Sequence, residues 1–124
     1  MFYYHNQIKM KLKKIAELLE GKTITSCNSP SLNVEKGFTS DLMSDVLTLG
    51  ECEDVILITG LANIQTIRTA EMAGLNYVAL VRGKKASEEM IALAEENDIN
   101  IIETAFSAFR ASAVLFHAGI RSIY

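Results

Sequence analysis

The chain has 124 residues, 49% of them hydrophobic and 22% charged, and a formal net charge of -3. This size and composition suit a single hydrophobic core, which excludes a disordered chain and predicts one domain. No apolar run approaches the roughly 18 residues that span a bilayer, and residues 1–19 lack the pattern of a secretory signal, so we expect a cytoplasmic protein without membrane association.

Charge is distributed unevenly along the chain. Lys9, Lys11, Lys13 and Lys14 supply four of the twelve basic residues, which leaves eight against fifteen Asp and Glu. Because contacts to nucleic-acid phosphates need a basic face, we exclude a general nucleic-acid binder. The four lysines fit the solvated side of an N-terminal helix.

The first part of the chain predicts short elements. Residues 1–9 lack an apolar period, which leaves two interpretations: a flexible N-terminal extension, or a functional start at Met10. A helix then runs to Gly21, which ends it in the C′ position. A strand over 22–26 follows, and a turn at Pro30 leads to a weaker strand over 32–38.

A second helix is predicted to end at Leu49. Thr39 or Ser40 is expected to cap it, with Asp41 in its first turn, where a negative charge is favourable.

From residue 54 onward the pattern is more regular. Strands alternate with helices, in the order strand 54–59, helix 64–73, strand 76–82, helix 87–97, strand 99–103 and helix 106–118. Such alternation predicts βαβ units and a mainly parallel sheet. We therefore expect an α/β fold with a single three-layer domain over residues 10–124.

The loop after strand 54–59 is the first candidate binding segment. Thr59 offers a hydroxyl, Gly60 a flexible backbone and Asn63 a helix N-cap, and exposed amide groups here are suited to an anion or a carboxylate. Alternatively, Gly60 only forms the turn and Asn63 only caps the helix.

The next loop is basic. Arg82, Gly83 and Lys84 follow strand 76–82, and a phosphate or another anion fits the Arg fork and the glycine amide. Alternatively, Lys84 and Lys85 pair with the glutamates that follow them on a solvated surface.

Thr104 stands at the end of the third strand of this series, and the strand ends at Thr59, Arg82 and Thr104 follow one another at a nearly constant spacing. Since the loops at the carboxyl ends of parallel strands meet in one crevice, the three loops predict one ligand site. The predicted ligand-binding residues are Thr59, Gly60, Asn63, Arg82, Gly83, Lys84 and Thr104.

The sequence offers no recognisable catalytic or metal motif. His5 and His117 lack a partner at a motif spacing, and Cys27 and Cys52 lack the paired spacing of zinc and redox sites, so we expect free, partly buried thiols. We predict no catalytic residue, no metal and no cofactor.

One segment matches a loose P-loop pattern, Ala16 to Thr23. A P-loop follows a strand and opens into a helix, whereas here the predicted helix comes first and the strand second. An enzyme of phosphoryl transfer therefore stays a less favoured alternative.

Phe106, Phe109, Ala113 and Phe116 recur at helical spacing in the last predicted helix. Such a stripe is more often part of a core or a dimer seam than a cofactor site.

Residues 37–47, 58–61, 65–70 and 81–84 resemble stand-alone proteins of the DRTGG domain family, and the resemblance extends from Met10 to the C-terminus. This family is similar to the N-terminal domain of bacterial HPr serine kinase/phosphorylase without the kinase domain, and related modules accompany CBS domains. The resemblance implies a homodimeric α/β module for regulation or ligand sensing, without established catalysis.

The chain departs from the family motif at both loops. Leu61 and Ala62 stand where the family has Asp-Arg, and Arg82-Gly83-Lys84 stands where it has Thr-Gly-Gly. Only the glycines carry over.

Two functional hypotheses follow. The first is a non-catalytic, homodimeric regulatory module whose strand-end loops bind a small anionic ligand such as a nucleotide. The second is a protein-interaction or assembly factor without a small-molecule ligand. Its partner would belong to a redox or hydrogenase-type system, an association that only the family resemblance implies.

Overall fold

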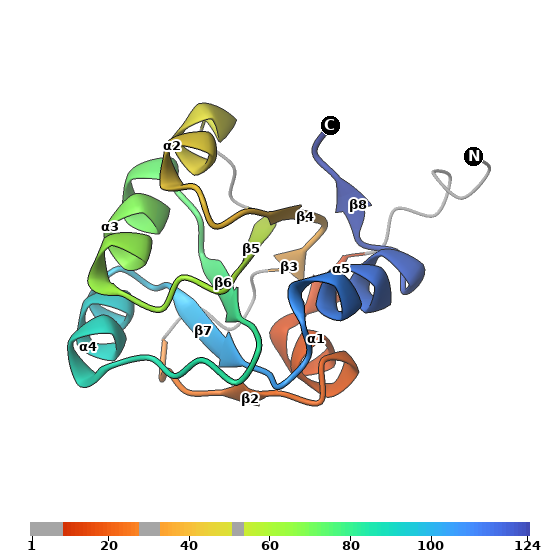
Figure 1. The fold of residues 1–124 in the computed structure, drawn as a ribbon, viewed down its shortest axis with the longest axis horizontal. Coiled ribbons are helices and arrows are strands. Elements are labelled where there is room, and N and C mark those ends of the chain that lie inside the picture. Colours follow the sequence, from red (N-terminus) through yellow and green to blue (C-terminus); the bar gives the residue numbers. More distant parts are fainter. Residues whose placement is uncertain (1–8, 28–32, 51–53) are drawn as a thin grey trace.

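The computed structural model describes residues 9–27, 33–50 and 54–124, which form a sheet between two layers of helices (Figure 1). Its strands are β1 (Met10–Lys11), β2 (Lys22–Thr23), β3 (Asn33–Val34), β4 (Lys36–Thr39), β5 (Val55–Thr59), β6 (Tyr77–Leu80), β7 (Asn100–Glu103) and β8 (Arg121–Ser122). Its helices are α1 (Leu12–Leu18), α2 (Met43–Val46), the 3-10 turn η2 (Leu47–Leu49), α3 (Ile64–Ala73), α4 (Glu88–Glu96) and α5 (Ala108–His117).

Six strands form the central sheet, in the order β2-β7-β6-β5-β4-β8. All neighbours in it pair in parallel except β2 and β7, while β1 and β3 form a separate antiparallel pair. The predicted α/β fold class with a mainly parallel sheet is confirmed.

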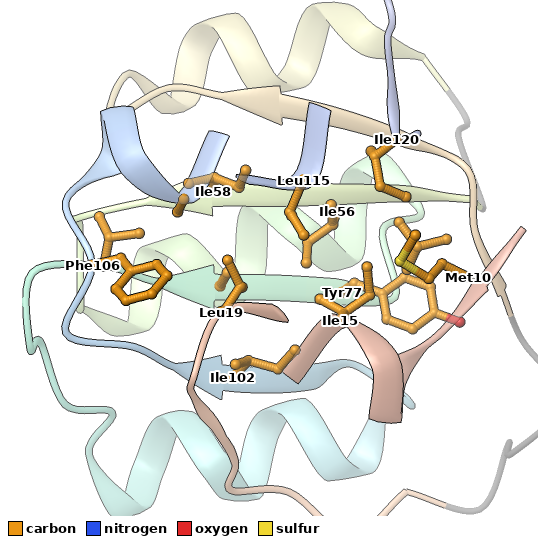
Figure 2. Packing of buried hydrophobic residues seen from close by; sticks show 14 residues of the cluster. Met10, Ile15, Leu19, Ile56, Ile58, Tyr77, Ile102, Phe106, Leu115 and Ile120 are labelled. Carbon is orange, nitrogen blue, oxygen red and sulfur yellow. The ribbon is translucent and has the colours of Figure 1, made fainter. Parts of the chain in front are cut away.

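Every residue of β5 and β6 is buried, because helices cover both faces of these strands. Ile56 and Ile58 pack toward α1 and α5, as Figure 2 shows, and join a cluster with Ile15 and Leu115. The alternate residues of β5, Val55 and Leu57, join a second cluster with buried residues of α2, α3 and α4. The two apolar clusters fix the three-layer arrangement.

The helix predicted after β4 is shorter than expected, and its predicted cap is wrong. Thr39 belongs to β4, where it pairs with Ile58, and α2 begins only at Met43 after Leu42, which makes no side-chain cap. Strand pairing therefore takes the residues that were expected to start the helix. Asp41 consequently precedes α2 instead of lying in its first turn.

Gly21 follows α1 as predicted, but it is not the left-handed C′ residue that ends the helix. Glu20, with a φ of 48°, adopts the left-handed conformation after α1. A Cβ atom on Gly21 would lie 2.7 Å from the carbonyl oxygen of Glu103, so glycine allows the chain to approach β7 closely. The strand that follows is β2, shorter than predicted and antiparallel to β7.

Some predictions fall outside the described residues. These are the extension predicted over residues 1–9, of which only Lys9 is described, the turn at Pro30, and the expectations for His5 and Cys52.

Tyr77 lies in the core beside Met10 and Ile15 (Figure 2). Its hydroxyl is buried without a hydrogen-bond partner in the described part of the chain. Burial of the phenol, followed by the negative charge of Asp54, raises the pKa of Tyr77 to about 12.

Tyr77→Phe is expected to raise the free energy of unfolding at pH 7 by about 1 kcal/mol, because it removes an unpaired buried hydroxyl. The wild-type protein is expected to lose stability as pH rises from 10 toward 12, because the unfolded phenol ionises at its ordinary pKa of 10.0 while the folded one holds its proton. Urea unfolding as a function of pH measures both effects. Tyr124→Phe, at a side chain that is 82% exposed, is the control, and a less stable Tyr77→Phe variant would contradict the prediction.

Candidate functional site

The strand register brings four loops to one edge of the sheet. Thr39 of β4 pairs with Ile58, Thr59 of β5 pairs with Leu80, and Leu80 of β6 pairs with Glu103 of β7. The segments that follow these four strands therefore leave from the same edge, which we call the carboxyl edge. The loops that hold the predicted site residues all begin there.

The backbone amide of Gly60 donates a hydrogen bond to a carboxylate of the protein itself. The Asp41 Oδ1 atom accepts a 2.7 Å hydrogen bond from the Gly60 amide and a 2.9 Å hydrogen bond from the Thr59 hydroxyl. The sequence predicted that this loop suits an anion or a carboxylate, and it missed the residue of the chain itself that supplies a carboxylate here. The missed signal is a strand that ends at Thr39, which places the next acidic residue at the carboxyl edge.

The surroundings of Asp41 favour its ionised form. The hydrogen bond from Gly60, then that from Thr59, and finally the positive charge of Arg82 lower the pKa of this carboxyl from 3.8, although partial burial opposes them. Asp41 is therefore a carboxylate at neutral pH.

Thr59 has a structural role at this edge. Its side chain is fully buried, and its hydroxyl donates to Asp41 and accepts a 3.1 Å hydrogen bond from the amide of Leu61. The hydroxyl thus ties the loop after β4 to the loop after β5. The predicted direct contact between Thr59 and a ligand is not available while these bonds hold.

Arg82 and Gly83 form a tight turn with positive φ angles of 58° and 71°, the pattern of a type I′ turn. The Arg82 amide donates to Phe106 at 2.8 Å, and the Gly83 amide donates to Thr104 at 3.0 Å. The Gly83 amide, which was predicted to contact an anion, thus donates to a carbonyl group of the protein instead.

The Arg82 side chain, in contrast, is exposed, and its Nη2 atom would lie 3.6 Å from a Cβ atom built on Gly60. The left-handed backbone of Arg82 costs about 1 to 2 kcal/mol. The turn therefore holds the guanidinium beside Gly60 at the expense of backbone strain.

The two lysines after this turn behave differently. The ammonium of Lys85 lies 3.5 Å from a carboxylate oxygen of Glu103, which is not one of the glutamates named in the sequence-based alternative. Lys84 is exposed, and its ammonium makes no hydrogen bond or ion pair with a described residue. Lys84 therefore remains open to a ligand.

Asn63 and Thr104 have internal partners. Asn63 caps α3 by accepting a 3.1 Å hydrogen bond from the amide of Thr66, as its alternative interpretation suggested. The Thr104 hydroxyl is buried, donates to the carbonyl of Leu19 at 2.7 Å and accepts from the amide of Phe106 at 3.1 Å. These bonds fix both loops. The Thr104 hydroxyl is buried with its partners, whereas the amide nitrogen of the exposed Asn63 donates to no described residue and stays open to a ligand.

The predicted aromatic stripe of the last helix divides into two parts. Phe106 precedes α5 and is 9% exposed in the core, beneath the guanidinium of Arg110 at 3.9 Å. Phe109 and Phe116 are 86% and 68% exposed. The buried side of α5 instead carries Ala111 and Leu115.

Phe109 and Phe116 border a groove of about 430 Å³ between α5 and strands β4 and β8. Phe38 and Tyr124 line the opposite side and contact each other edge to face, with ring centroids 6.3 Å apart. The Thr39 and Ser112 hydroxyls hydrogen-bond at 2.6 Å and join β4 to α5 along this groove. The end of β4 therefore connects the aromatic groove to Asp41.

Within residues 9–27, 33–50 and 54–124, no group of three His, Cys, Asp or Glu side chains is arranged to hold a metal ion, and no helix is long and apolar enough to cross a bilayer. Cys27 is a half-buried free thiol, as predicted, and burial raises its pKa. The P-loop-like segment runs from α1 into β2, the order that its sequence context indicated.

No protein-family model matches the chain, and no curated protein matches its sequence. Among solved structures, the fold is similar to that of the CBS and DRTGG domains in the regulatory region of the Clostridium perfringens pyrophosphatase, crystallised with its activator diadenosine tetraphosphate. The two are 21% identical, with a TM-score of 0.72 over 86% of this chain and 46% of that chain. The present chain thus spans less than half of that region, and the similarity shows a shared fold.

Thr59→Val is expected to raise the pKa of Asp41 and still leave it below 3.8, because the hydrogen bond from Gly60, the larger cause of the lowering, remains. The stabilisation from Asp41 is present above pH 3.8 and is lost as pH falls through the lowered pKa, so the variant is expected to lose it at a higher pH. NMR titration of the Asp41 carboxyl carbon measures the shift. An unchanged pKa of Asp41 would show that the hydroxyl bond does not hold in solution.

Proposed function

We propose that the chain is a non-catalytic regulatory module of the DRTGG type that binds a small anionic ligand, such as a nucleotide, at the carboxyl edge of its sheet. The observation that carries this proposal is the exposed guanidinium of Arg82, which a strained turn holds beside Gly60. An arginine fork is suited to phosphate and carboxylate groups, and Lys84 adds a second open cation.

The comparison with the pyrophosphatase regulatory region supports this proposal at the level of fold. That region was crystallised with a dinucleotide activator, and it contains a DRTGG domain. The resemblance of residues 37–47 and 81–84 to the DRTGG family points in the same direction.

Arg82→Ala is expected to weaken the binding of AMP by about 1 to 3 kcal/mol, because a charge-assisted hydrogen bond is lost, with little change in the urea midpoint. Isothermal titration calorimetry measures the affinity. Arg68→Ala removes an exposed arginine from α3 and is expected to bind AMP as the wild type does. Equal affinities of the two variants would show that the basic turn is not the binding site.

We further propose that the module is a homodimer that pairs through the groove beside α5. Phe109 and Phe116 protrude from the same surface that contains the groove. In a dimer with a two-fold axis, these two side chains of each copy would therefore enter the groove of the other. The Thr39–Ser112 hydrogen bond offers a route by which occupancy of the carboxyl edge reaches this interface.

The same aromatic groove is the observation that favours the second function, a protein-interaction or assembly factor. Exposed aromatic side chains beside a groove are typical of protein interaction sites. In that case the groove accepts a different protein, such as a component of a redox or hydrogenase-type system, and no small molecule is needed.

Replacing Phe109 and Phe116 together by serine is expected to convert a dimer into a monomer, because the variant loses the two largest exposed apolar side chains of α5. Sedimentation velocity measures the mass. Met72→Ser changes a methionine that is 63% exposed on α3 and is expected to leave the dimer intact. A monomeric wild type would contradict the homodimer and favour the second function.

A further inference from the structure

Asp41 occupies the position that an external anion would take at Gly60. The Gly60 amide and the Thr59 hydroxyl, which point to the carboxyl edge, both donate to Asp41 Oδ1. A free phosphate that approached this amide would have to displace a carboxylate held by two hydrogen bonds, and would meet its negative charge. Phosphate alone is therefore a poor ligand for this part of the edge.

The second oxygen of the same carboxylate is not used. Asp41 Oδ2 accepts no hydrogen bond from a described residue, and the Asp41 side chain is exposed. A carboxylate oxygen only accepts hydrogen bonds, so a ligand group that hydrogen-bonds to it must be a donor. A hydroxyl group meets this requirement.

Arg82 also lies close to Gly60. A Cβ atom on Gly60 would be 3.6 Å from Arg82 Nη2 and 3.7 Å from both Asp41 oxygens, so both charged groups border the space that a side chain at this position would fill. No ion pair within 4.0 Å joins the Asp41 carboxylate to the Arg82 guanidinium. The site therefore presents a hydrogen-bond acceptor and an anion-binding fork beside one glycine.

We propose that Asp41 determines the specificity of this site, which takes a phosphate ester carrying a free hydroxyl: the hydroxyl donates to Asp41 Oδ2 and the phosphate binds Arg82. A pentose phosphate has both groups within a few bonds of each other, as a nucleotide or as a free sugar phosphate. Asp41 favours such a ligand over inorganic phosphate, which has the charge of the ester and no sugar hydroxyl. The inference rests on the proposed function, because it uses the same Arg82.

The test compares four probes on the wild-type protein by calorimetry: AMP, ribose 5-phosphate, 2′,3′-dideoxy-AMP and inorganic phosphate. AMP or ribose 5-phosphate is expected to bind at least about tenfold more tightly than phosphate, the size of effect that a hydrogen bond to a charged group gives. The comparison of AMP with ribose 5-phosphate shows whether the source is a nucleotide or a sugar phosphate. The dideoxy compound is expected to lose most of the advantage of AMP.

Asp41→Asn is the decisive variant. Its amide oxygen can still accept from Gly60 and Thr59, while its amide nitrogen replaces the acceptor at Oδ2 with a donor and removes the charge. The preference for the hydroxyl-bearing ester over inorganic phosphate is expected to fall about tenfold. Asp45→Asn removes an exposed negative charge from the neighbouring α2 and is expected to keep the preference.

The measured affinities distinguish the role of Asp41 from ligand binding at Arg82. If phosphate and the esters bind equally well to the wild type and binding requires Arg82, the proposed function stands and the role of Asp41 is overturned. An unchanged preference in Asp41→Asn overturns it as well, provided that thermal unfolding shows a folded variant. If none of the probes binds the wild type, both proposals fail.

Discussion

The parallel pairing of β4, β5, β6 and β7 is the constraint on which the carboxyl edge depends. Thr59, Leu80 and Glu103 pair in register, and Thr39 pairs with Ile58, one residue before Thr59, so the loops that follow these four strands leave from the same edge of the sheet. A shift of one residue in any pair would turn a buried side chain toward the opposite layer of helices. The two apolar clusters on the faces of the sheet therefore also hold the polar groups at its edge.

At Gly60 the protein supplies its own negative group. The Gly60 amide and the Arg82 guanidinium attract a negative charge, and the carboxylate of Asp41, which follows the adjacent strand β4, lies beside both. This internal carboxylate lowers the attraction of the edge for simple anions. It also leaves the other oxygen of Asp41 at the edge as an exposed hydrogen-bond acceptor.

The carboxyl edge is also held by contacts with neighbouring segments on both sides. The left-handed Arg82 is retained because the amides of the turn bind the carbonyl groups of Phe106 and Thr104, so the loop after β7 stabilises the loop after β6. On the other side, Thr39 binds Ser112 of α5 and joins the edge to the aromatic groove. A ligand that alters the segment between Thr39 and Asp41 thus acts close to a surface suited to protein contact.

The amino-acid sequence determined the class of fold and most elements of its second half. The apolar runs of β5 and β6 and the caps at Asn63 and Ser87 are local signals, since strand burial and helix capping depend on neighbouring residues, and α3 has the bounds that its periodicity predicts. The sequence also identified the carboxyl edge, because strand ends alternate with helices at a regular spacing.

Only the tertiary structure decided which polar groups at that edge are free. The amides and hydroxyls of Thr59, Gly60, Gly83 and Thr104 find partners that are distant in sequence, such as Asp41 and Leu19, and no local pattern reveals such pairs. The beginning of α2 was likewise decided by the pairing of Thr39 with Ile58, and the exposure of Phe109 by the direction in which α5 packs on the sheet. Local chemistry thus predicted the edge of the sheet, whereas the tertiary structure left four exposed polar groups there: one oxygen of Asp41, the side-chain cations of Arg82 and Lys84, and the amide nitrogen of Asn63.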